Sequence, residues 1–200
     1  MRKRLHRHVR TARYILYKET LVDYKEHFWT FLGSFVGIGI LGFIQSKFLS
    51  TSDNVLLIGS FGASSVLIYG IINSPLAQPR NLIGGHVICA IVGVTVHKII
   101  PNEMWMSSAL AVSLSIVMMQ MTKTLHPPGG ATALIANIGS DKIHALGYIY
   151  VLNPVLAGAA ILLLVAIIFN NSTKHRHYPN NKNWYKVWRR YRRIPNSQKK

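Results

Sequence analysis

The sequence predicts an all-α integral membrane protein in which about six helical segments are embedded in the bilayer. Of its 200 residues, 50% are hydrophobic and only 14% are charged, whereas soluble domains average about 25% charged residues. The charges are also unevenly placed. Eight of the 23 Lys and Arg residues lie in residues 1–25 and ten in residues 174–200. The sparsely charged middle of the chain can therefore face lipid.

The charge distribution divides the chain into three parts. We expect a basic N-terminal segment at residues 1–27, an embedded domain at residues 28–169 and a basic tail at residues 170–200. Lys and Arg accumulate in the cytoplasmic flanks of membrane segments, so both ends are expected in the cytoplasm. The protein is thus predicted to be a multi-pass protein of the cell membrane with an even number of crossings.

Four apolar runs approach the length of about 20 residues that a spanning helix needs. They are Phe28–Phe48, Leu82–Ile100, Trp105–Met121 and Tyr148–Phe169. Two glycine-rich stretches lie between them, at Val55–Ile72 and Gly129–Ile138, and the second is short. The six segments form two triplets in the order long, short, long.

The two short segments resemble each other and indicate an internal repeat. Gly62-Ala63-Ser64 in the first corresponds to Gly130-Ala131-Thr132 in the second. If every segment crosses the membrane, the second triplet is inverted relative to the first, as in many transporters. If the short segments re-enter, four spanning helices remain, and the charge rule does not decide between the two.

The second short segment is expected to follow a break in a helix. Pro127 and Pro128 stop the incoming helix because they lack a backbone N–H, and proline suits the first turn of the next helix. A short helix should therefore begin near Gly129 to Thr132 at membrane depth. Its free N–H groups and partial positive charge would attract an anion.

The candidate substrate-binding groups gather around the starts of the two short segments and the polar turns near them. Hydroxyl, amide and imidazole groups can donate hydrogen bonds, and an imidazole can also relay a proton. Two of the candidates, Arg80 and Lys123, are cations that can attract an anion or, equally, anchor their helices at the membrane interface. The candidates are Ser64, Arg80, Asn81, Lys123, His126, Gly130 and Thr132.

Two motifs, in order, carry a resemblance to a known family: Ser74-Pro75-Leu76-Ala77-Gln78-Pro79-Arg80-Asn81-Leu82-Ile83-Gly84-Gly85-His86, and His126-Pro127-Pro128 followed by Gly129-Gly130-Ala131-Thr132-Ala133-Leu134-Ile135. Over about residues 28–169 the chain resembles the HPP family of integral membrane proteins. Characterised cyanobacterial and plastid members are nitrite transporters, so the resemblance implies a small-anion transporter, with nitrite the first candidate. The chain has Gly129 where many relatives have alanine, and it lacks the CBS domains of some bacterial relatives.

Other classes of function are disfavoured by the residues. The embedded region has three acids, all near segment ends, and no cluster with metal-ligand spacing, so we expect no enzyme, metal or cofactor. The basic tails adjoin apolar segments, which favours anionic lipid over nucleic acid as their partner. The alternative function is a non-transporting membrane component whose tails recruit lipid or a partner protein. A homo-oligomer is compatible with either function.

Overall fold

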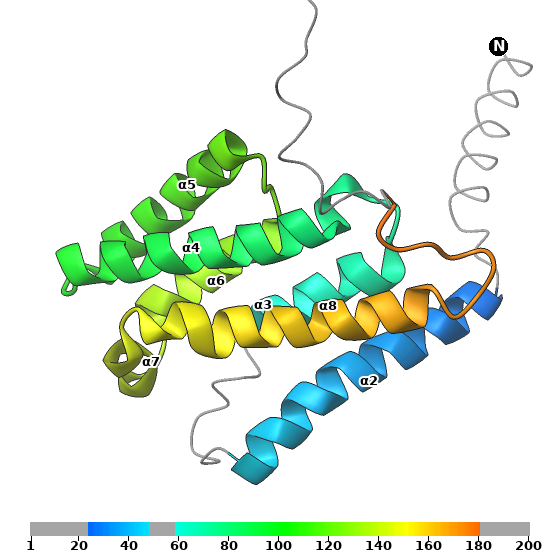
Figure 1. Cartoon of the computed structure of the whole chain (residues 1–200). Coiled ribbons are helices and arrows are strands. Elements are labelled where there is room, and N and C mark those ends of the chain that lie inside the picture. Colours follow the sequence, from blue (N-terminus) through cyan, green and yellow to red (C-terminus); the bar gives the residue numbers. More distant parts are fainter. Residues whose placement is uncertain (1–23, 49–58, 181–200) are drawn as a thin grey trace, which may run out of the picture.

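The computed structural model describes residues 24–48 and 59–180, and these residues form helices and turns without any strand. The all-helical prediction is confirmed (Figure 1). The basic segment before residue 24, the tail after residue 180 and the start of the first short segment lie outside the described residues. The helices are α2 Tyr24–Phe48, α3 Gly59–Ser65 with a π turn Val66–Gly70, α4 Pro79–Ile99, α5 Met104–Thr122, α6 Pro127–Ile138, α7 Asp141–Leu146, and α8 Ala157–Asn170 after a π turn Val151–Leu156.

Four helices of the described chain are long and apolar enough to cross a membrane, as predicted. They are Tyr24–Lys47, Pro79–Ile99, Met104–Thr122 and Val151–Asn170, with lengths of 24, 21, 19 and 20 residues. The last of them departs from helical geometry at Asn153, just before Pro154. Because proline cannot donate a backbone hydrogen bond, the interruption falls where the sequence cannot continue a regular helix.

The second short segment and its flanks run along α4 from one end to the other. Arg80 at the start of α4 donates to the carbonyl oxygen of Thr122 at the end of α5, at 2.7 Å. Thr95 near the end of α4 lies 3.0 Å from the hydroxyl of Tyr148 before α8. The chain between residues 123 and 147 therefore travels from one end of α4 to the other. This arrangement favours a pass over a re-entrant loop for the second short segment, whereas the start of the first lies outside the described residues.

The packing of the helices follows the two predicted triplets. The long helix α4 packs on α5 and α6, whereas α8 packs on α2 and α3. Each triplet thus places its last helix against the first two helices of the other triplet (Figure 1). The short helices α3 and α6 also contact each other, so they meet between the two long helices. This is the arrangement expected of an inverted repeat.

Close approach between α4 and α6 depends on glycine. A Cβ atom built on Gly93 would lie 2.7 Å from the carbonyl oxygen of Ala133, and one on Gly129 would lie 3.0 Å from that of Gly85. In the other triplet, a Cβ on Gly158 would clash with the Phe61 ring of α3. Small residues let helix backbones pack closely in lipid, where apolar contact alone gives little preference for association.

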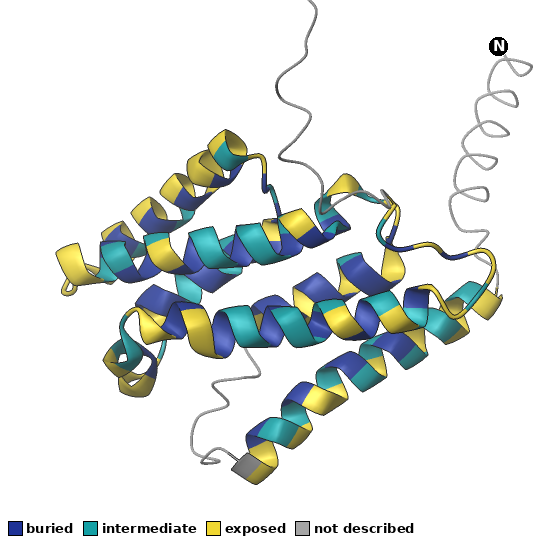
Figure 2. Cartoon of the chain, viewed as in Figure 1, coloured by how far each residue is buried: buried dark blue, intermediate teal, exposed yellow. Residues whose placement is uncertain are grey.

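Apolar side chains cover the outside of the bundle as well as its interior. Phe31, Phe35 and Ile168 are 64%, 66% and 64% exposed, while Leu41 and Leu162 are fully buried. Figure 2 shows exposed and buried residues alternating along α2 and α8. An exposed apolar surface on the long helices is expected where lipid rather than water surrounds them.

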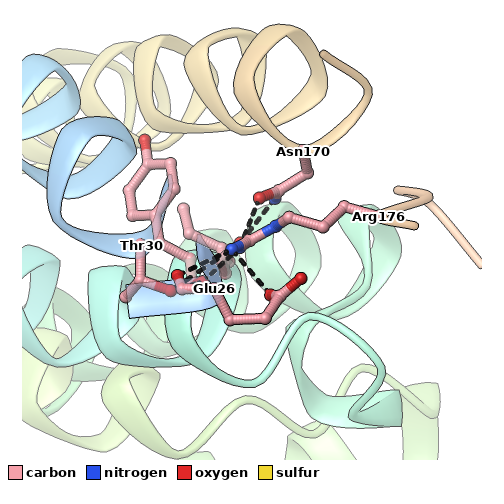
Figure 3. Close-up of polar contacts among 6 residues, drawn as sticks. Glu26, Thr30, Asn170 and Arg176 are labelled. Carbon is pink, nitrogen blue, oxygen red and sulfur yellow. Dashed lines mark hydrogen bonds and ion pairs between the residues drawn. The ribbon is translucent and has the colours of Figure 1, made fainter. Parts of the chain in front are cut away.

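The segment 171–180 folds back over one end of the bundle through Arg176 (Figure 3). The guanidinium of Arg176 forms an ion pair with Glu26 of α2 at 3.0 Å and donates to Thr30 at 3.3 Å and Asn170 at 2.9 Å. It also donates to the carbonyl oxygen of Tyr69, at the end of the π turn after α3. The two ends of the described domain therefore lie at the same end of the bundle, which agrees with an even number of passes.

Tyr178 fastens the same segment to the turn before α4. Its hydroxyl donates to the carbonyl oxygen of Ala77 at 2.6 Å. Burial raises the pKa of this phenol, so it remains protonated and able to donate at neutral pH. Ala77 belongs to the 3₁₀ helix Pro75–Ala77, which caps this end of the bundle. The segment 171–180 thus holds the turn from outside.

Candidate functional site

Five polar side chains form a fully buried cluster where the two short helices meet α4. Each of them is 0% exposed. Ser60 and Ser64 come from α3, His86 from α4, His126 from the residue before α6, and Thr132 from α6. We call these five residues the central cluster. His86 is the eighth residue of α4, which places it about 10 Å from the start of that helix at 1.5 Å per residue.

Short hydrogen bonds connect the whole central cluster. The Ser64 hydroxyl lies 2.7 Å from Nε2 of His86 and 2.9 Å from Nε2 of His126. On the other side of the His86 ring, Nδ1 lies 2.7 Å from the hydroxyl of Thr132. That hydroxyl is also 2.9 Å from Oγ of Ser60. Every polar side-chain atom of the cluster has a partner, as buried polar groups require.

The position of His126 is fixed by contacts on three sides. Its Nδ1 donates to the carbonyl oxygen of Leu76 in the 3₁₀ helix, at 2.8 Å. The amide of Asn81 donates to the carbonyl oxygen of Leu125 at 2.7 Å and so holds the link before α6 against α4. The absence of a side chain at Gly85 leaves room for the Cβ of His126. These contacts turn the imidazole toward Ser64.

The structure brings together three of the predicted site residues, Ser64, His126 and Thr132. Asn81 lies beside this group and contacts the link rather than the central cluster. Arg80 is exposed and caps the last turn of α5, and Lys123 ends that helix in the left-handed conformation with φ of 57°. The two cations therefore lie toward the end of the bundle, outside the central cluster.

The start of α6 offers few free backbone amides, because its first two residues, Pro127 and Pro128, have no N–H. The N–H of Gly129 donates to the carbonyl oxygen of His126 at 2.8 Å, and α6 begins at Pro127. Only the first four N–H groups of a helix lack partners within it, and Thr132 is the sixth residue of α6, so its N–H lies inside the helix. A Cβ on Gly130 would come closest to Val112 of α5, away from the cluster. The groups that meet at the centre are therefore side chains.

Three residues around the centre were missing from the predicted site. His86 links Ser64 to Thr132, Ser60 contacts Thr132, and the hydroxyl of Tyr150 donates to the carbonyl oxygen of Thr132 at 3.1 Å. His86 could have been found, because an ionisable residue inside an apolar spanning run usually serves a function. Ser60 and Tyr150 carry no comparable signal in the sequence.

A cavity of about 270 Å³ lies further along α4 and α6, toward the end of the bundle opposite Arg176. The rings of His97 and His144 stack within it, with centroids 3.9 Å apart. The ammonium of Lys98 lies 5.5 Å from the ring centroid of Tyr148. Ala136, one helical turn after Thr132, lines the cavity, so its inner end lies about 6 Å along α6 from the central cluster.

Neither the central cluster nor this cavity resembles a metal site. Across the described residues, no group of three or more His, Cys, Asp or Glu side chains is placed to hold a metal ion. The two histidines of the central cluster share a serine as their common partner, whereas zinc sites bring three or four protein ligands to one point. The chemistry available at the centre is hydrogen bonding and proton transfer.

Comparison with known proteins places the sequence of this chain in a family. The profile for the HPP transmembrane region matches residues 19–179. Two Dictyostelium discoideum proteins, each described as a transmembrane protein, are 47% and 44% identical over 160 residues, which is 78% of this chain. The aligned part is 56% and 51% of their lengths, so the chain spans about half of each relative. No solved structure matches. The family match covers the central cluster and both triplets, and the chain belongs to the HPP transmembrane family.

Proposed function

We propose that this protein is a membrane transporter for a small inorganic anion, with nitrite as the first candidate. The observation that carries the proposal is the central cluster, in which hydroxyl and imidazole groups from both short helices meet on α4. In transporters with inverted repeats, the substrate binds near the middle of the membrane, at interrupted helices between the repeats. The central cluster occupies the corresponding place.

The chemistry of the cluster favours a compact anion. Ser60, Ser64 and Thr132 can each donate one hydrogen bond. His86 can donate through an N–H, and His126 can do so at Nε2 when it is protonated, because its Nδ1–H is donated to Leu76. The partial positive charge at the start of α6 adds to this potential. An oxyanion with two or three atoms could take the place of the Ser64 hydroxyl between the two histidines. A larger organic acid would need the helices to separate. Nitrite meets this requirement and is the anion that the family resemblance implies.

The present arrangement closes the central cluster on both sides. All five of its side chains are fully buried, and the turn at Leu76 covers His126 from one end. Transport would require the short helices to move relative to α4, which would open the cluster to one side at a time. The sequence contains no ATP-binding P-loop, so the energy would come from an ion gradient or from a separate partner.

The cavity at His97 and His144 is the expected route for the anion from the opposite end of the bundle. Lys98 lines the cavity, and the inner end of the cavity approaches the central cluster along α6. With both termini in the cytoplasm, this cavity would open to the outside of the cell membrane. The basic tails would then lie on the inner leaflet, where anionic lipids attract Lys and Arg.

Uptake into proteoliposomes tests the proposed function. The purified full-length protein would be exposed to a panel of nitrite, nitrate, formate and chloride, with protein-free vesicles measuring passive permeation. We expect at least one compact anion to enter much faster with protein present. The variant Thr132→Val, which removes a hydroxyl with little change in volume, should slow uptake, whereas Thr132→Ser should be mild.

The outcome also separates transport from the alternative function. If the folded wild-type protein admitted no anion faster than protein-free vesicles, transport would be rejected. A non-transporting component that recruits lipid or a partner protein would then be the better account. In that case cellular function should survive Thr132→Val and be lost when the basic tails are removed.

A further inference from the structure

The hydrogen bonds of His126 determine where the hydrogen of its neutral ring lies. Its Nδ1 is 2.8 Å from the carbonyl oxygen of Leu76, and a carbonyl oxygen can only accept. Nδ1 therefore carries the hydrogen. Nε2, which lies 2.9 Å from the hydroxyl of Ser64, is then the basic nitrogen of the neutral ring.

The hydroxyl of Ser64 can serve two proton states of this ring. In the first state it donates to Nε2 of His126 and accepts from Nε2 of His86. In the second state it turns to the carbonyl oxygen of Ser60, 3.0 Å away, and accepts from both histidines. His126 then carries a proton on each nitrogen. Nε2 of His126 can thus take up one proton while every polar side-chain atom of His126 and Ser64 keeps a partner.

No described carboxylate is placed to balance that proton. The acidic side chains of the described chain are Glu26 in the first turn of α2, Glu103 just before α5, and Asp141 at the start of α7. All three lie at segment ends. Arg80 and Lys123, at the end of the bundle where α5 ends, would oppose a further positive charge at the centre.

The titratable groups that face the central cluster from its neighbours are neutral at their ordinary pKa values. Cys89 on α4 points at the start of α6, because a Cβ on Gly129 would lie 2.8 Å from its sulfur. Tyr150, before α8, donates to the carbonyl oxygen of Thr132. The helices α3 and α6 contribute hydroxyl groups, and the 3₁₀ helix contributes the carbonyl oxygen of Leu76. Neither thiol nor phenol is ionised near pH 7.

We propose that the protein moves its anion together with one proton, which binds to Nε2 of His126, in an electroneutral symport. This inference rests on the proposed function and adds the co-substrate. A proton alone at this buried site would be an uncompensated cation, and a bare anion would be equally unfavourable, whereas the two together neutralise each other. The protein can therefore change the side to which its site opens in two forms: with the site empty, or with both the anion and the proton bound.

The proton balance of one cycle is simple. A proton from water binds the lone pair on Nε2 of His126 as the anion enters, and Ser64 turns its hydroxyl away. When the site opens to the other side, the anion leaves and Nε2 returns its proton to water. Ser64 then donates to Nε2 again. No other bond is made or broken, and no net charge crosses the membrane.

Simultaneous measurement of proton and anion flux tests the symport. Full-length protein is reconstituted in vesicles that contain a fluorescent pH indicator, and potassium with valinomycin sets the membrane potential. Protein-free vesicles supply the passive flux of nitrous acid, which is subtracted. We expect one proton to enter with each anion. The rate of anion uptake should not change when the membrane potential is reversed. An inward proton gradient alone should drive accumulation of the anion.

A variant at His126 gives a second readout. His126→Asn keeps a polar side chain but removes the basic nitrogen, so it should abolish accumulation driven by the proton gradient. The matched control is His177→Asn, an exposed position outside the central cluster. Because the wild-type flux ratio is decisive alone, the test does not depend on His126→Asn folding.

The outcomes separate this inference from the proposed function. Anion uptake that carries net charge and moves no proton would overturn the symport and leave anion transport standing. Uptake that stays coupled to protons in a folded His126→Asn variant would show that the proton binds elsewhere and would also overturn it. The absence of any anion uptake by the folded wild-type protein would reject the proposed function itself.

Discussion

Ser64 and Thr132 hold equivalent positions in the two repeats, and their hydroxyls contact opposite nitrogens of one imidazole, that of His86. Gly62-Ala63-Ser64 and Gly130-Ala131-Thr132 thus correspond in space as well as in sequence. A two-fold relationship between the short helices brings one hydroxyl from each to the same ring. His86 therefore contacts both repeats at once, as a substrate bound between them would.

Close packing at Gly85 should be essential for the position of His126. A Cβ on Gly85 would lie 2.5 Å from the Cβ of His126 and 2.9 Å from the carbonyl oxygen of Thr124. Since backbone must move to relieve this overlap, Gly85→Ala should lower the free energy of unfolding by about 1–3 kcal/mol. The matched control is Gly39→Ala, where nothing lies within 4 Å. Thermal unfolding in detergent measures both, and equal midpoints would contradict the packing described.

Arg176 should contribute more to stability than any other cation of the segment 171–180. Its side chain is 2% exposed and is paired with Glu26. Arg176→Gln removes the hydrogen bonds that Arg176 donates to Glu26 and to the side-chain oxygen of Asn170, and because Glu26 is 37% exposed and still meets water, we expect a loss of about 1–3 kcal/mol. Lys174→Gln, at an exposed position, serves as the control in chemical or thermal unfolding. Similar unfolding of the two variants would show that the contacts of Arg176 are unimportant for stability.

Lys98 should assist capture of the anion from the cavity that it lines. Lys98→Gln removes one partly exposed positive charge, an effect of about 0.4–1 kcal/mol, so the half-saturating anion concentration should rise about two- to fivefold. The maximal rate should change little because the central cluster is intact. Lys142→Gln makes the same charge change on α7, outside the cavity lining. Equal half-saturation for both variants would argue against this route.

Both termini should lie in the cytoplasm. The Glu26–Arg176 ion pair places the two ends of the described domain together, and the positive-inside rule assigns that end to the cytoplasm. A reporter that functions only in the cytoplasm, fused separately to each terminus, should be active in both fusions. Activity at one terminus alone would contradict the even number of passes, and silence at both would reverse the orientation.

The sequence predicted the architecture well because its signal is a direct property of lipid-facing helices. Apolar runs of sufficient length located all four long helices within a few residues, and the glycine-alanine-hydroxyl repeat located the two short ones. Pro127 and Pro128 placed the start of α6, since proline is confined to the first turn of a helix. These features depend on local composition and need no knowledge of packing.

The candidate site was less predictable because it depends on contacts between distant residues. The sequence indicates Ser64, His126 and Thr132 by their places near helix starts. Ser64 contacts His126 directly, but it is joined to Thr132 by His86, which lies within an apolar run. Arg80 was a candidate for its charge, yet its guanidinium caps α5. Which way a side chain points, and which amides are already bonded, follows from the relative rotation of helices and is not written in local sequence.

The most direct test of the transport site compares two serine variants. Ser64→Ala removes the hydroxyl that joins His86 to His126, whereas Ser34→Ala removes one that donates to the carbonyl oxygen of Phe31 within its own helix. Loss of a hydrogen bond to a charged group costs about 1.5–3 kcal/mol, so anion uptake into proteoliposomes should fall about tenfold or more in Ser64→Ala. Ser34→Ala should match the wild type. Unchanged uptake in a folded Ser64→Ala protein would contradict the assignment of the central cluster as the site of transport.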